Sequence, residues 1–139
     1  MRLRELPTRL ATGAYILHSG LDKRRASAEV AQGMHGMASG AYPFLTRMEP
    51  TSFLKRLSTG EIVVGSLLLA PFVPTAVAGA ALTGFAGGLV TMYLRTPALR
   101  KPGSIWPSQQ GTAISKDVWM LGIGVGLLAD ALVDRKRGD

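Results

Sequence analysis

Ionisable side chains beside long apolar stretches are the residues of this sequence best suited to chemistry. Glu61 directly precedes an uncharged stretch that begins at Ile62. Placing a carboxylate there is costly unless a cation pairs with it, so Glu61 indicates either a functional site or a structural ion pair. As a functional residue it could accept or relay a proton. Paired with Arg95 or Lys23, it could instead lock two helix ends together. The sequence leaves both interpretations open.

Further candidates flank the same apolar stretches. His18 and Asp22 are four residues apart, so they share one face of a helix. His18 is a second candidate for proton transfer. Lys23 and Arg95 could hold an anionic group, and Trp119 could stack on a quinone ring. We therefore expect a polar cluster with the catalytic candidates Glu61 and His18 and the binding candidates Glu61, Arg95, Asp22, Lys23 and Trp119.

The sequence has few residues that could bind a metal and none that could supply a thiol. The chain has no cysteine, which excludes disulfides, Cys-bound zinc and cysteine-ligated iron–sulfur clusters. Its two histidines, His18 and His35, lie 17 residues apart and form no HxxxH or HExxH pattern. We expect no metal site and no intrinsic cofactor, with a quinone as the one ligand to consider.

The element that must position Glu61 is defined by 33 consecutive uncharged residues, Ile62 to Leu94. A single helix of this length would extend about 50 Å, whereas the hydrocarbon core of a bilayer is about 30 Å thick. The stretch must therefore fold back. Pro71 and Pro74 interrupt it near the middle, so we predict a tight hairpin there.

The sequence predicts an all-α fold, a four-transmembrane-helix bundle in one domain of residues 1–139. The segments between the long helices are mixed in composition. Residues 23–52 contain methionines and two prolines, so short interfacial helices and turns are expected there, and the loop at 96–115 is predicted to be irregular. The predicted spans are residues 6–22, 53–71, 75–95 and 116–134.

Composition and charge support a membrane setting. Hydrophobic residues make up 47% of the chain and charged residues 18%, and the formal net charge is +7. The basic residues flank the apolar segments, with Arg2, Arg4 and Arg9 before the first one, which suits lipid headgroups better than nucleic acid. The two ends of the bundle carry 6 and 10 of the 16 Lys and Arg residues. A literal count places the longer loops in the cytoplasm, against the usual expectation for a basic N-terminus, and orientation stays open.

Small residues recur at helical spacing within the last two predicted spans. Such stripes let helix backbones approach closely in lipid, where dispersion holds helices together. A dinucleotide-binding interpretation of the glycines in the last span is rejected, because no strand precedes them. The residues predicted to pack the helices are Ala80, Gly84, Gly88, Gly122 and Gly126.

Three segments resemble the DoxX family of small bacterial membrane proteins. They are RLATGAYILHSGLDK at residues 9–23, EIVVGSLLL at residues 61–69 and, after an alanine- and glycine-rich third span, KDVWMLG at residues 116–122. The resemblance implies a four-helix integral membrane protein, in some members a subunit associated with quinone-linked sulfur oxidation or with a membrane oxidoreductase complex. The long segment 23–52 and the uncharged hairpin match this pattern less well. The positions that coincide with the family's pattern are Gly20, Lys23, Glu61, Gly65, Lys116 and Asp117.

Two functions of different classes follow from these observations. The first is an accessory multi-pass subunit of the plasma membrane that places a quinone or a redox partner at the polar end of the bundle. The second is a structural or assembly module that binds a larger membrane complex, or a second copy, through its small-residue faces. A catalytic activity of its own is not favoured, and the expected partners are lipids and membrane proteins, not nucleic acid. A solute or ion pathway is a weaker third reading, because four short spans enclose little space.

Overall fold

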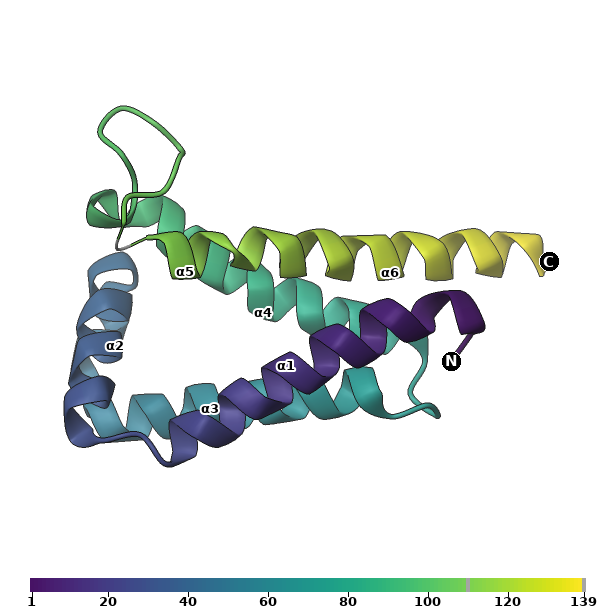
Figure 1. Cartoon of the computed structure of the whole chain (residues 1–139), viewed down its shortest axis with the longest axis horizontal. Helices are drawn as coiled ribbons and strands as arrows, with labels where there is room; N and C mark the ends of the chain where they lie inside the picture. The colour runs from purple at the N-terminus through teal and green to yellow at the C-terminus, as the bar shows by residue number, and fades with distance from the viewer. Residues whose placement is uncertain (110, 139) are drawn as a thin grey trace.

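The computed structural model describes residues 1–109 and 111–138, and the regular structure in them is helical. Five helices of 14 to 21 residues are joined by short helical turns (Figure 1). The predicted all-α class is therefore confirmed. The elements are η1 (Leu3–Glu5), α1 (Leu6–Arg24), α2 (Ala28–Ala41), η2 (Pro43–Arg47), α3 (Pro50–Leu69), α4 (Thr75–Arg95), η3 (Pro97–Leu99), α5 (Thr112–Ser115) and α6 (Asp117–Arg137).

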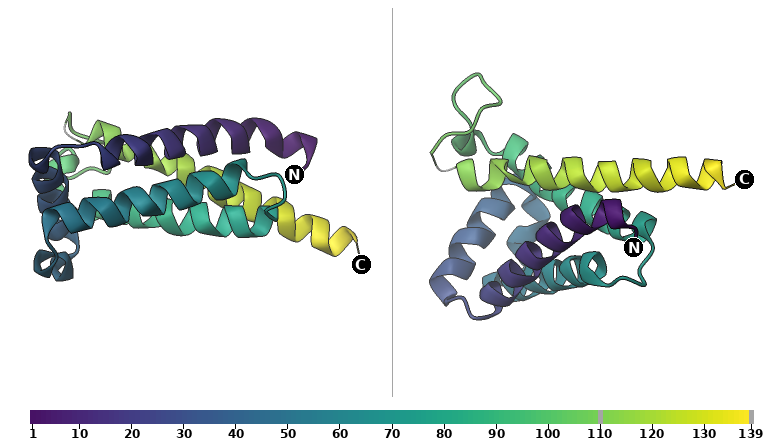
Figure 2. Two further views of the ribbon diagram at one scale, coloured as in Figure 1. Left: turned by 90° about the horizontal axis from the view of Figure 1, so that it is seen from below. Right: turned by 45° about the vertical axis from the view of Figure 1, so that its right-hand side comes forward.

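The four long helices lie within a few residues of the segments predicted from the sequence, and they pack as two pairs. The most extensive contacts join α1 to α3 and α4 to α6. Helix α2 stands across one end of the long helices, and the chain termini lie together at the opposite end (Figures 1 and 2). The central core combines apolar residues from both pairs: Ile16, Val64, Leu68, Ala78, Leu82 and Leu127.

Within each pair, glycines allow the helix backbones to meet. A Cβ atom at Gly65 of α3 would lie 2.7 Å from the backbone nitrogen of Leu17 in α1. In the other pair, a Cβ at Gly124 of α6 would lie 2.8 Å from the backbone nitrogen of Thr83 in α4. These distances leave no room for a methyl group, so glycine is required for the observed approach.

The small-residue stripes named from the sequence do not form these contacts. Gly84, Gly88, Gly122 and Gly126 have no atom of a neighbouring element within 4 Å of a built Cβ, and Ala80 is exposed. The prediction that these residues hold the chain's own helices together is therefore wrong. The two helices are rotated so that the rows containing Gly79 and Gly124 meet instead.

The hairpin predicted at Pro71 and Pro74 is confirmed, since α3 ends at Leu69 and α4 begins at Thr75. Arg9 holds this hairpin. Its guanidinium group is fully buried and donates to the carbonyl oxygens of Leu67, Leu68, Ala70 and Val73 at 2.9–3.2 Å, and to Thr75 Oγ1 at 3.5 Å. The expectation that Arg9 faces lipid headgroups is thus wrong, because its donors bond to carbonyl oxygens at the end of α3 and in the turn, and to the Thr75 hydroxyl.

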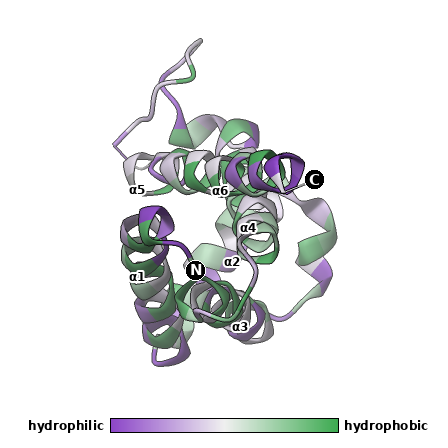
Figure 3. Ribbon diagram, turned by 90° about the vertical axis from the view of Figure 1, so that its right-hand side faces the viewer, coloured by the Kyte–Doolittle hydropathy of each residue, from purple (hydrophilic) through white to green (hydrophobic). Residues whose placement is uncertain are grey.

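By length and composition, one helix in the described residues could cross a membrane, namely α4 (Thr75–Arg95). Within its apolar window, 28% of the residues are buried inside the molecule, and the others are half-buried or exposed. The other three long helices carry more charge, such as Lys55, Arg56 and Glu61 in α3. Figure 3 shows hydrophobic residues around the bundle and hydrophilic residues gathered at helix ends, such as the C-terminal end of α6.

Residues 23–52, which were predicted to contain short helices, contain α2 and η2. Helix α2 begins after Ser27, whose hydroxyl accepts a hydrogen bond from the backbone nitrogen of Val30. The second short helix, η2, is held against α2 by His35, whose Nε2 lies 2.7 Å from the carbonyl oxygen of Leu45. Helix α2 itself packs on α3 and α4 across the end of the long helices.

Candidate ligand-binding cavity

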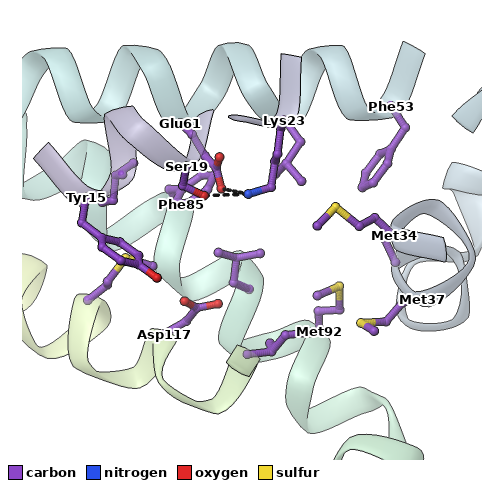
Figure 4. Close-up of a pocket in the computed structure, with 16 residues that line it drawn as sticks. Tyr15, Ser19, Lys23, Met34, Met37, Phe53, Glu61, Phe85, Met92 and Asp117 are labelled. Atoms are coloured by element: carbon purple, nitrogen blue, oxygen red, sulfur yellow. Dashed lines mark hydrogen bonds and ion pairs between the residues drawn. The ribbon is translucent and has the colours of Figure 1, made fainter. Parts of the chain in front are cut away.

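A cavity of about 430 Å³ lies between the two helix pairs at the end covered by α2. Residues from all six α-helices line it (Figure 4). Its walls are mostly apolar. They include aromatic rings and four of the six methionines of the chain, and methionine is a flexible side chain that adapts to varied apolar shapes. These apolar lining residues include Phe53, Phe85, Met34, Met37, Met92 and Met120.

One wall of the cavity carries an ion pair. Lys23 Nζ donates to Glu61 Oε1 at 2.9 Å and to Ser19 Oγ at 2.7 Å (Figure 4). Glu61 is only 6% exposed. Its second carboxylate oxygen, Oε2, is buried and has no hydrogen-bond partner among the described residues. An unsatisfied buried acceptor of this kind costs free energy, so a ligand that donates to Oε2 would be stabilised.

The opposite wall contributes a second carboxyl group. Asp117 is the first residue of α6, and Figure 4 shows its side chain directed into the cavity across from Lys23 and Glu61. Its carboxylate makes no ion pair with another described residue.

The packing of α1 on α3 places Lys23 beside Glu61. A Cβ at Gly20 would lie 3.0 Å from Glu61 Cβ, so the two helices touch at this level. Ser58 Oγ donates to the carbonyl oxygen of Gly20 at 2.6 Å and fixes the register. Ser19 and Lys23 lie one turn apart on the inner face of α1, which brings both into the cavity.

The structure brings together only part of the cluster expected from the sequence. Glu61 and Lys23 pair, but His18 and Asp22 lie on the outer face of α1, where His18 is 74% exposed and contacts Asp22 at 3.2 Å. Arg95 lies against Tyr42, with its guanidinium 5.7 Å from the ring centre, and donates to a backbone carbonyl of α2. Trp119 is 68% exposed and does not line the cavity.

Several lining residues were missed by sequence reasoning. Ser19 and Tyr15 precede Lys23 by one and two turns, so the helical period could have identified them. Met34 and Met37 belong to α2, and nothing in their spacing indicates that α2 covers this end of the bundle. The methionines of residues 23–52 were the one feature of the sequence that could have indicated that this segment lines a binding site.

The arrangement can bind a hydrophobic molecule with a polar head. Glu61 Oε2 and the Asp117 carboxylate are acceptors, and Lys23, which uses two of its three N–H groups, has one donor left. The cavity volume falls in the range of sites for small ligands, about 300–1,000 Å³. No family model matches the sequence, and neither the curated proteins nor the solved structures include a match, so the DoxX resemblance stays a prediction from its motifs.

Proposed function

We propose that this chain is a multi-pass integral membrane protein that acts as an accessory subunit of a membrane redox complex and holds a quinone head group in its cavity. The observation that carries the proposal is Glu61, which lines a mostly apolar cavity and whose Oε2 is buried without a hydrogen-bond partner among the described residues. A membrane subunit with such a site can bind a lipid-soluble molecule at a defined place and orientation. The chemistry itself would belong to the partner.

The outward surfaces of the long helices support the membrane setting. Leu10 of α1, Val63 of α3 and Leu132 of α6 are all exposed, and α4 is mostly unburied. The two buried charges within these helices are compensated, since Arg9 is bonded to carbonyl oxygens and Glu61 pairs with Lys23. In this proposal the compensated buried charges and the exposed apolar residues let α1, α3 and α6 cross a bilayer beside α4, although their composition alone is less apolar.

The cavity residues fit a quinone in both redox states. A quinone carries two electrons and two protons between its oxidised and reduced forms. Lys23 can donate its remaining N–H to a carbonyl oxygen, whereas Glu61 Oε2 and Asp117 can accept hydrogen bonds from hydroxyl groups. Glu61 can also take up a proton at Oε2 while Lys23 keeps its other oxygen bonded.

A second function, assembly without chemistry, is favoured by a separate observation. The stripes at Gly84 and Gly88 of α4 and at Gly122 and Gly126 of α6 have open space above them. Such faces allow a helix of another chain to approach closely in the bilayer. In this alternative the protein joins a larger complex through these glycines, and Glu61 is only a structural ion-pair residue.

One set of variants separates the two functions. Glu61→Gln, Gly84→Leu and Gly126→Leu are each reconstituted in nanodiscs, and binding of a decyl-substituted benzoquinol is measured by equilibrium dialysis. The same variants are purified from native membranes, and associated proteins are compared. Glu29→Gln is the matched control, because Glu29 is an exposed acid of α2 outside the cavity.

For the redox role we expect Glu61→Gln to weaken quinol binding about tenfold, the effect of losing one hydrogen bond to a charged group. Glu29→Gln and the glycine variants should bind like the wild type. If Glu61→Gln binds the quinol unchanged while Gly84→Leu and Gly126→Leu lose their associated proteins, the assembly function replaces the redox one.

A further inference from the structure

We infer that the cavity also takes hydrophobic cations, molecules that carry one primary ammonium group on an apolar or aromatic body. This inference rests on the proposed membrane setting of the cavity and adds a ligand class to it. It does not depend on a redox partner. Its basis is the charge and hydrogen-bonding state of the polar side chains that line the cavity.

The polar groups of the cavity have one negative charge in excess. Glu61 and Asp117 supply two carboxyl groups, and Lys23 supplies one ammonium. Lys23 forms its ion pair with Glu61, so Asp117 is the carboxyl group of the cavity without an ion pair among the described residues. A carboxylate that is partly buried beside apolar walls is unfavourable, and a bound cation would compensate it.

The hydrogen-bonding groups favour the same ligand. Glu61 Oε2 is buried without a donor, and the Asp117 carboxylate makes no ion pair with other described residues. A primary ammonium has three N–H donors and no acceptor, which complements two carboxylates. A neutral hydroxyl offers one donor and no charge, so it satisfies these groups less completely.

The remaining walls suit the body of such a ligand. The rings of Tyr15, Phe53 and Phe85 line the cavity together with the methionines (Figure 4). Aromatic faces attract cations, and methionine sulfur packs well against aromatic groups. Tyr15 is 75% exposed although it lines the cavity, so the cavity opens to the outside beside α1. In a bilayer, a membrane-soluble amine could enter there.

The test compares a cation with its neutral analogue. The full-length protein is placed in nanodiscs of phosphatidylcholine, which carries no net charge, and binding of 4-phenylbutylammonium and 4-phenylbutanol is measured by equilibrium dialysis, with empty nanodiscs subtracted. The variants are Asp117→Asn, Glu61→Gln and the control Glu29→Gln. Asp117→Asn breaks no ion pair within the described chain, so it tests the site even where Glu61→Gln disturbs folding. Circular dichroism verifies the helical content of each variant.

We expect saturable binding of the ammonium compound, weakened about tenfold or more by Asp117→Asn and unchanged by Glu29→Gln, with the alcohol binding at least about tenfold more weakly. Equal binding of the alcohol and the ammonium, or unchanged ammonium binding by Asp117→Asn, overturns the inference. Quinol binding without ammonium binding also overturns it and leaves the redox proposal standing. Ammonium binding without quinol binding removes the redox proposal and supports the inference.

Discussion

Arg9 is the residue on which the turn between α3 and α4 most depends. It is fully buried, and its five N–H donors reach four carbonyl oxygens and one hydroxyl near the end of α3. Glu5, 4% exposed, lies 3.8 Å from the guanidinium and accepts a hydrogen bond from Thr75 at 2.6 Å. Glu5 therefore balances the charge of Arg9 within the protein, and Arg9 bonds four carbonyl oxygens near the hairpin.

Replacing Arg9 by methionine should destabilise the protein by about 2–5 kcal/mol, because the hairpin carbonyls and Glu5 lose their donor in a buried position. Chemical unfolding followed by circular dichroism in detergent measures the change. Arg4→Met is the control: Arg4 pairs with Asp130 and Asp134 at the surface and is 51% exposed, so its loss should cost less than about 1 kcal/mol. Equal effects of the two changes would contradict the role assigned to Arg9.

The sequence identified Glu61 and offered Lys23 as one of two partners, and that pairing is confirmed. It did not identify which side of α1 faces α3. His18 precedes Ser19 by one residue, and a rotation of 100° per residue places the two on different faces of the helix. Without a known neighbour, the polar residues on both faces were equally good candidates, so the exposed pair of His18 and Asp22 was included.

At the level of elements, the choice of packing face decides what each glycine does. Helix α6 has glycines at positions 122, 124 and 126, and only Gly124 touches α4. The sequence contains more than one row of small residues on each helix, all with helical spacing. Spacing predicts that close packing occurs, but the rotation of the helix about its axis depends on contacts with the partner helix.

Two substitutions on α6 should change stability in opposite directions. Gly124→Ala would place its Cβ 2.6 Å from Thr83 Oγ1 and 2.8 Å from Thr83 N, so we expect a loss of about 1–3 kcal/mol. Gly122→Ala meets no neighbouring atom within 4 Å, so alanine should stabilise the helix by up to about 1 kcal/mol. Thermal unfolding in detergent compares the two, and destabilisation by Gly122→Ala would show that its face is already packed.

For the whole molecule, the proposed topology places both termini on one side of the membrane and the loop after α4 on the other. The absence of native cysteine makes this directly measurable. Lys101→Cys and Lys136→Cys introduce single thiols at exposed positions near opposite ends of the structure. Intact cells that carry each variant are treated with a membrane-impermeant maleimide. One of the two thiols should react in intact cells, and the other should react only after the cells are permeabilised. Reaction of both, in intact cells, would contradict the multi-pass proposal.

The helical class and the extents of the four long helices could be predicted, because prolines, charges and apolar runs mark their ends. The position of α2 could not be predicted from the sequence. Its buried residues are Ala31, Ala38 and Ala41, and side chains this small do not indicate which surface of the bundle the helix will cover. The cavity, which α2 closes at one end, could therefore not be predicted from the sequence.

Polar side chains link the two helix pairs at the end where the chain termini lie. There the hairpin after α3 is bound by Arg9, and Arg4 links the start of the chain to Asp130 of α6. At the other end the pairs are bridged by α2, which packs on both α3 and α4 through buried alanines and larger side chains such as Met37. We expect any relative rotation of the pairs to change the cavity most at the end away from Arg9, where Met34 and Met37 of α2 lie.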